Sequence, residues 1–181
     1  MNDIWPKILR TTRRKESPWI ELITRDVQFS AQGATEAYDA IGQQDYCVAL
    51  AVTPDSKVLL VRQFRPAIER FSLEFPAGVI ELGESASSAT ARELLEETGF
   101  PAETIEPIGK TATNARRISN STHSFFVRTG ARVVGFAEEP GVSVSLVTAD
   151  QLRGLILSGE FSEQCHLGVI ALAYARSLIT F

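Results

Sequence analysis

The chain has 181 residues, of which 44% are apolar and 22% charged, and it carries a net charge of −4 at neutral pH. These values are typical of an ordinary globular protein that buries a substantial core in one domain, with or without a short extension. The acidic balance argues against a general nucleic-acid-binding protein, which would carry a basic face.

The N-terminal part of the chain predicts a small β-rich extension. Residues 1–17 are mixed and basic, and they lack the apolar stretch of a signal peptide. Residues 19–24 and 27–31 alternate apolar and polar side chains, and Gln32 and Gly33 supply a turn. We therefore expect a β-rich N-terminal arm over residues 1–44 and a main domain over residues 45–181.

The main domain begins with two apolar, β-branched runs, residues 46–53 and 57–63, which Pro54 and Asp55 separate. This pattern predicts a hairpin at the centre of a mixed sheet. Further strands are expected at 73–75, 79–80, 104–111, 123–129 and 142–148, and helices at 85–98, 149–158 and 163–178. The expected fold class is α/β (α+β), a mixed β-sheet sandwiched between helices.

The helix over residues 85–98 has clear end signals, with Ser85 as its N-cap, Gly99 as the glycine after its last turn and Pro101 beyond it. At about 100° per residue, Glu93 and Glu97 lie about 40° apart and Glu96 falls on the same side. Carboxylates at this spacing repel one another, so the face calls for cations. Arg92 can neutralise one charge, and a hard divalent ion such as Mg²⁺ suits the rest.

The stretch from Gly78 to Phe100 reads GVIELGESASSATARELLEETGF. It matches Gx5Ex7REUxEExGU, with U an apolar residue, at every position, and it therefore resembles the signature of the Nudix hydrolases. The preceding VLLVRQFRP (58–66) and SLEFPAGVIELGE (72–84) are similar to the ADP-ribose pyrophosphatase branch of that family, as are WIEL near the N-terminus and the late SGEF…VIALAYA segment. The likeness covers most of residues 19–177.

The resemblance implies roles for the residues around the signature. Glu93 and Glu97 would be the main metal ligands, joined by the Ala77 carbonyl and by Glu96 directly or through water. The metal would be Mg²⁺, with Mn²⁺ possible. Glu84 and Arg92 would pair and hold the loop to the helix, although Arg92 also counts among the candidate catalytic residues.

Substrate contacts are expected from residues on both sides of the signature. Arg65 is a candidate for a phosphate contact, because guanidinium donors match phosphate oxygens, and its alternative is a surface arginine at a strand end. Glu74 is a candidate for substrate recognition. Trp19 is a candidate for stacking on the nucleobase, since the arms of this branch pair two subunits, and its alternative is core or interface packing. The resemblance thus implies a homodimer with composite sites.

The general base is expected in the late loop GFAEEPG (135–141), which offers Glu138 and Glu139, with Glu96 as a fallback. Solvated loop charges are the alternative for this pair. One departure from the branch is the absence of a proline in the segment Asn114–Arg117, which holds Arg116 and Arg117. These two arginines could contact phosphates or a sugar, or could be exposed charge.

The function that the resemblance implies is Mg²⁺-dependent hydrolysis of the pyrophosphate bond in ADP-ribose or a related nucleoside diphosphate sugar. A GDP-mannose or UDP-sugar pyrophosphatase is the alternative with the same chemistry, and a non-catalytic nucleotide-sensing Nudix module is the alternative from another class. No apolar run reaches membrane-spanning length. Cys47 and Cys165 read as buried free thiols of a reducing compartment, so we expect a cytoplasmic protein. We expect neither a nucleic-acid partner nor a membrane partner.

Overall fold

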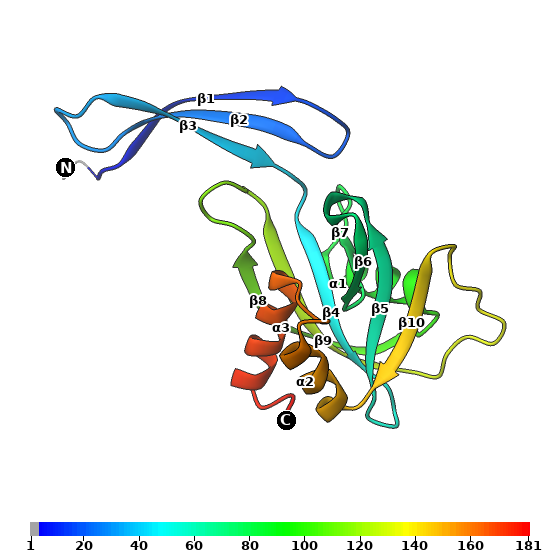
Figure 1. The fold of residues 1–181 in the computed structure, drawn as a ribbon. Coiled ribbons are helices and arrows are strands. Elements are labelled where there is room, and N and C mark those ends of the chain that lie inside the picture. Colours follow the sequence, from blue (N-terminus) through cyan, green and yellow to red (C-terminus); the bar gives the residue numbers. More distant parts are fainter. Residues whose placement is uncertain (1–3) are drawn as a thin grey trace. The chain divides into compact units, whose positions relative to one another are not determined.

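The computed structural model describes residues 4–181 and divides the chain into two compact units (Figure 1). The N-terminal unit comprises the chain up to Gln44 together with Ala112–Ser121, and the main unit comprises Asp45–Thr111 and Thr122–Phe181. Of the expected arm, residues 1–3 lie outside the described part. The loop Ala112–Ser121 thus belongs with the N-terminal unit although it comes from the middle of the sequence.

The N-terminal unit is an antiparallel sheet of three strands in the order β1-β2-β3, namely β1 (Lys7–Lys15), β2 (Glu21–Gln28) and β3 (Thr35–Gly42). The sheet pairs Thr11 with Arg25 and Arg25 with Tyr38 across its width. The alternating stretches 19–24 and 27–31 are not separate strands, because the single strand β2 runs from the first stretch into the second and ends at Gln28. Its full ladder of hydrogen bonds to two neighbours favours one continuous strand over a break.

The main unit is built on a seven-stranded mixed sheet. Its path is β10-β5-β4-β9-β8, with β6 paired to β5 and β7 paired to β4. β4 runs parallel to β9, and the pairs β4–β7, β5–β6 and β5–β10 are antiparallel. The strands are β4 (Tyr46–Val52), β5 (Val58–Arg65), β6 (Arg70–Glu74), β7 (Ala77–Val79), β8 (Ala102–Ala112), β9 (Ser121–Thr129) and β10 (Val142–Val147). The predicted mixed sheet is confirmed.

Helices cover both faces of this sheet, as the alternation of β4 requires. Val48 and Leu50 point into a core with α2 (Ala149–Ser158) and α3 (Gln164–Ala175). Cys47 and Ala49 point into a second core with α1 (Ala86–Thr98). Figure 1 shows α2 and α3 together on one side of the strands. The predicted sandwich of a mixed sheet between helices is therefore confirmed.

Two short connections join the strands on either side of β5. The predicted turn after β4 is present, with the Thr53 N–H donating to the Lys57 carbonyl and the Ser56 N–H donating to the Thr53 carbonyl. A 3-10 helix, η1 (Pro66–Ile68), joins β5 to β6. Within residues 4–181, no helix is long and apolar enough to cross a membrane.

Candidate active site

Helix α1 is fixed at both ends by the residues that the sequence indicates. The Ser85 Oγ accepts the N–H of Ser88 at 3.1 Å, and Gly99 ends the helix in the left-handed region at φ 74°. Between these caps, Ala89, Thr90, Leu94 and Thr98 are buried. Glu93 and Glu97 lie on the same side of the helix as these residues and are partly buried, so their carboxylates are held against the sheet rather than in open solvent.

Both carboxylates meet the chain at the start of β7. The Glu97 Oε2 accepts the N–H of Ala77 at 3.0 Å. A Cβ on Gly78 would lie 2.0 Å from the Glu93 Cδ, so only glycine allows the carboxyl group of Glu93 to approach the backbone there. The structure therefore brings together three of the predicted metal-site residues: Ala77, Glu93 and Glu97.

Arg92 is the centre of an ion-pair network at the N-terminal side of these carboxylates. Its Nε and Nη2 donate to the two oxygens of Glu84 at 3.1 and 3.0 Å, which confirms the predicted pair between loop and helix. Its Nη1 donates to Glu93 at 2.8 Å and to Glu96 at 3.2 Å, and its Nη2 also donates to the Val79 carbonyl. Arg92 thus holds the loop, β7 and the acidic face in one arrangement.

The acidic face carries more negative charge than Arg92 can balance. Burial raises the pKa of Glu97 to about 7, against the hydrogen bond from Ala77 and with the help of the charge on Glu93. Burial also raises the pKa of Glu93, against the pull of Arg92. Two carboxylates that are costly to ionise beside each other form a site where a cation is favoured.

The donor set suits a hard divalent ion that also binds substrate. Within residues 4–181, no three His, Cys, Asp or Glu side chains converge as a complete metal site would require. Mg²⁺ commonly takes one or two carboxylates and completes its shell with water and phosphate oxygens. Glu93, Glu97 and the Ala77 carbonyl could supply the protein's share, and Glu96, whose side chain is 57% exposed, could act through water.

Arg65 and Glu74 form a pair on β5 and β6 rather than two separate contacts. The Arg65 Nε donates to the Glu74 Oε1 at 2.9 Å, and its Nη2 donates to the Oε2. Burial opposes ionisation of Glu74, but the hydrogen bonds and charge of Arg65 outweigh it and lower the pKa of Glu74. A guanidinium has five donors, so this pair leaves Arg65 capacity for a phosphate oxygen.

Tyr46, on β4, lies among the same charges and was missed by the sequence interpretation. Burial raises the pKa of its phenol, and the charges of Arg65, Glu74 and Glu97 all act on it. Tyr46 therefore belongs to the group that joins the acidic face to the Arg65–Glu74 pair. A tyrosine at the start of an otherwise apolar strand was the available signal, because a buried phenol needs a polar partner.

The loop with Glu138 and Glu139 is anchored to the C-terminal end of α1. Arg132 donates from its Nε to the Thr98 carbonyl at 2.9 Å, and the Val133 N–H donates to the Gly99 carbonyl at 2.8 Å. Arg132 also donates to Glu138 at 2.9 Å. Glu139 is exposed, and among residues 4–181 its carboxylate has no hydrogen-bond partner. The two candidate bases thus differ, since only Glu138 is already paired.

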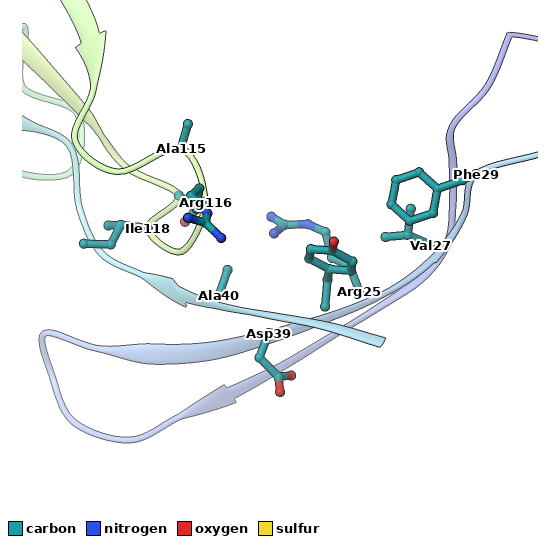
Figure 2. A pocket seen from close by; sticks show the side chains of 10 residues that line it. Arg25, Val27, Phe29, Asp39, Ala40, Ala115, Arg116 and Ile118 are labelled. Atoms are coloured by element: carbon teal, nitrogen blue, oxygen red, sulfur yellow. The ribbon is translucent and has the colours of Figure 1, made fainter. Parts of the chain in front are cut away.

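The remaining predicted contacts lie in the N-terminal unit. Arg116 lines a pocket of about 480 Å³ with Arg25, Phe29 and Tyr38, and Figure 2 shows Arg25 and Arg116 reaching into it from opposite walls. Phe29 and Tyr38 pack edge to face at 6.1 Å. The other lining residues are Val27, Asp39, Ala40, Ala115, Ile118 and Ser119. Arg25, Phe29 and Tyr38 were not among the residues expected from the sequence.

Arg117 and Trp19 stand apart from this pocket. Arg117 donates to the Asp39 carbonyl at 3.1 Å, and its own carbonyl accepts the Ile41 N–H, so it ties the loop to β3. Trp19 precedes β2 and is 67% exposed. Its stacking on a nucleobase stays a prediction.

Comparison with known proteins agrees with this arrangement. Residues 44–164 match the model of the NUDIX domain. The chain is 36% identical over 89 residues to an ADP-ribose pyrophosphatase of Bacillus subtilis, which covers 49% of this chain and 48% of the relative. It is 57% identical over 49 residues to an ADP-sugar pyrophosphatase of Mus musculus, which covers 27% of this chain and 22% of the relative. The matched part thus spans half or less of these relatives.

The fold also matches a solved structure. A crystal structure of an ADP compounds hydrolase superposes with a TM-score of 0.78 at 21% identity, covering 94% of this chain and 92% of that one. That likeness extends the comparison of folds beyond the matched domain. With the signature residues of α1 and the match over residues 44–164, the chain belongs to the Nudix family.

Proposed function

We propose that this protein hydrolyses the pyrophosphate bond of ADP-ribose or a related nucleoside diphosphate sugar with the help of Mg²⁺. The observation that carries the proposal is the convergence of Glu93 and Glu97 on the backbone of Ala77 and Gly78. The names of the Bacillus subtilis and Mus musculus relatives support an ADP-ribose or ADP-sugar substrate.

In this proposal the residues of the main unit divide the work between metal, phosphate and water. Glu93, Glu97 and the Ala77 carbonyl would hold Mg²⁺, which would supply positive charge to neutralise the phosphates and to lower the pKa of a water molecule. Mn²⁺ offers the same oxygen preference. Arg92 keeps the acidic face in place, and Arg65 donates to a phosphate oxygen while Glu74 orients it.

Glu139 is the favoured base because its carboxylate is exposed and unpaired, whereas Glu138 accepts from Arg132 and Glu96 accepts from Arg92. A base must accept the proton that water loses as its oxygen attacks phosphorus. Water adds across the P–O–P bond, so ADP-ribose gives AMP and ribose 5-phosphate. The same reaction on GDP-mannose or a UDP-sugar gives the nucleoside monophosphate and the sugar phosphate.

We also propose that the active form is a homodimer whose N-terminal units face each other. Ile8 and Tyr38, on the three-stranded sheet, are 59% and 44% exposed, and Phe29, directly after β2, is 48% exposed; a second copy would cover such side chains. Trp19 and Arg116 would then be available to a nucleotide held between subunits. A cytoplasmic location agrees with two cysteines that form no disulfide, of which Cys47 is buried and Cys165 is partly buried.

A substrate panel tests the activity. The purified chain is incubated with Mg²⁺ and ADP-ribose, GDP-mannose or UDP-glucose, and the released monoesters are treated with phosphatase and measured as inorganic phosphate. We expect the highest rate with ADP-ribose and no turnover with chelator. A higher rate with GDP-mannose or UDP-glucose would show that this compound, and not ADP-ribose, is the preferred substrate. A folded protein that binds nucleotide but turns over no compound of the panel would be a sensing module.

A further inference from the structure

His166, on α3, is a buried imidazole that the proposed reaction does not use directly. Its side chain is enclosed, with only 1% of the residue exposed. Its Nδ1 accepts the backbone N–H of Phe75 at 2.9 Å. The ring also stacks on the ring of Phe75 at 5.9 Å and 5°, and Phe161 packs on it at 6.3 Å. One side chain of α3 therefore holds both the backbone and the ring of Phe75.

The hydrogen bond defines the protonation state of His166. A ring nitrogen that accepts an N–H carries no proton, so the imidazole is neutral and its proton sits on Nε2. Burial lowers the pKa of His166, and the positive charge of Arg65 adds to this, while the carboxylates of Glu163 and Glu74 oppose it. The Glu163 Oε2 lies 3.8 Å from Nε2, beyond hydrogen-bond distance. The neutral form is the one that this surrounding favours.

Phe75 lies in the middle of the segment from Glu74 to Ala77, which links β6 to β7. Glu74 holds Arg65 at one end, and the Ala77 N–H donates to Glu97 at the other. The Pro76 carbonyl accepts the Ala49 N–H at 2.9 Å. The partners in these contacts lie on β5, on β4 and on α1. His166 adds a contact from α3, which packs on the face of the sheet opposite to α1.

Loss of this anchor would leave the Phe75 N–H without its acceptor in the core. Phe75 is fully buried, and a buried N–H without a partner carries the whole cost of its desolvation. The segment could recover a partner only by moving toward water or toward another acceptor. Either movement displaces Glu74, which orients Arg65 in the proposed mechanism, and Ala77, whose carbonyl is assigned to the metal.

We propose that His166 is a positioning residue: its Nδ1 fixes the Phe75 backbone and thereby sets Glu74 and Ala77 against the carboxylates of α1. The proposal rests on the pyrophosphatase activity proposed above. Residues that orient the groups touching a metal, and displacements of about 1 Å at a reacting centre, each change activity by about 10- to 100-fold. We expect an effect of that size on kcat, with the KM for ADP-ribose changed less than the kcat.

Three substitutions separate positioning from simple filling of the core. In His166→Asn, the amide oxygen can take the place of Nδ1 and accept the Phe75 N–H. In His166→Gln, the amide lies one carbon further out, closer to the place of Nε2. His166→Leu fills the space with an apolar side chain and offers no acceptor. We expect His166→Asn to keep kcat near that of the parent protein, and His166→Gln and His166→Leu to lose about 10- to 100-fold.

Phe161→Leu is the matched control, because it disturbs the same aromatic cluster without removing the hydrogen bond. It should lower the melting temperature and leave kcat per folded molecule unchanged. Amide exchange gives a readout besides activity: the Phe75 amide should lose protection in His166→Leu and keep it in His166→Asn, while the β9 amides stay protected in both.

The outcomes distinguish the two roles and the two proposals. If His166 only fills space, His166→Leu should equal or exceed His166→Asn in both melting temperature and kcat, and that result would overturn the inference. An unchanged Phe75 amide in His166→Leu would do the same. If the parent protein turns over none of the nucleotide sugars, the proposed function fails instead. Should His166→Asn not fold, a kcat of His166→Leu equal to that of Phe161→Leu per folded molecule would still reject positioning.

Discussion

The sheets of the two units are stabilised by different interactions. In the main unit, strands such as β4 are buried on both faces between α1 and the α2–α3 pair. Among the described residues of the N-terminal unit, Ile23 is the only hydrophobic residue that is buried. Its strands are joined by ladder hydrogen bonds and by surface ion pairs such as Arg10–Asp26 and Arg13–Glu21.

The difference in burial indicates a different role for each unit. Surface ion pairs contribute about 0 to 1 kcal/mol each, and a small sheet needs a buried apolar face for its stability. The N-terminal unit therefore presents a surface, whereas the main unit is a rigid support that can hold like charges together. The packing of Leu94 and its neighbours holds α1, and with it Glu93 and Glu97, against the sheet.

The largest effect is expected from Glu93→Gln in the main unit. The amide keeps the shape of the side chain and removes the charge that would bind Mg²⁺, so kcat should fall by about 100-fold or more, as for other groups that stabilise transition-state charge. The melting temperature should stay the same or rise, because burial opposes ionisation of Glu93. Steady-state kinetics with ADP-ribose and circular dichroism measure the two quantities.

Glu106→Gln is the control for this substitution, since Glu106 is an exposed glutamate on β8. It should leave both kcat and the melting temperature unchanged. Full activity in Glu93→Gln would remove the acidic face of α1 from the mechanism.

The next effect tests the packing difference between the two sheets. Leu50→Ala in β4 removes a fully buried side chain and should lower the free energy of unfolding by about 3 kcal/mol. Ile8→Ala in β1 removes a side chain that is 59% exposed, and in the monomer it should cost less than about 0.5 kcal/mol. Urea unfolding of both variants at a concentration below dimerisation gives the comparison. Equal costs would mean that the two sheets are stabilised in the same way.

The same difference explains what the sequence could predict. The strands of the main unit bury alternate residues on two faces, and its helices carry apolar stripes, so β4, β5, α1 and α3 were all expected near their observed bounds. The strands β1 and β3 were missed, because KILRTTRRK and TEAYDAIG bury almost nothing and need no apolar alternation. A strand that is held by backbone pairing with its neighbours, and not by burial of its side chains, needs no alternation of apolar and polar residues in its sequence.

The candidate site divides along a similar line. Glu93, Glu96 and Glu97 come from one helix, whose regular geometry places them together from spacing alone. The pairing of Arg65 with Glu74 was not expected, although both residues were singled out. The contact between His166 and Phe75 joins residues 91 positions apart, and no local pattern encodes it. Long-range side-chain pairs of this kind depend on how the helices dock on the sheet.

A smaller effect is expected at the surface of the N-terminal unit. Ile8→Asp places a charge among the exposed apolar residues of the sheet, and it should weaken the proposed homodimer by at least about tenfold, because a buried unpaired charge is costly. Light scattering coupled to size exclusion should show the mass falling from that of two chains to that of one. Thr12→Asp is the matched control on the same strand, because Thr12 pairs with Thr24 on the other face. A dimer that survives Ile8→Asp would have its interface elsewhere.

The smallest effect is a pH dependence confined to the main unit, which contains both histidines, His123 and His166. The pKa of His166 is lowered from its ordinary value of 6.5 by burial, so the unfolded chain takes up a proton at a higher pH than the folded one does. The stability that this histidine contributes is therefore complete above pH 6.5 and is lost as the pH falls toward the folded pKa. Relative to His166→Leu, the urea midpoint of the parent protein should fall between pH 7.5 and 5.5. Amide protection in β2 should show no such difference between the two proteins, since the N-terminal unit holds no histidine. If the urea midpoints of the two proteins changed with pH in the same way, His166 would be protonated equally in the folded and unfolded states.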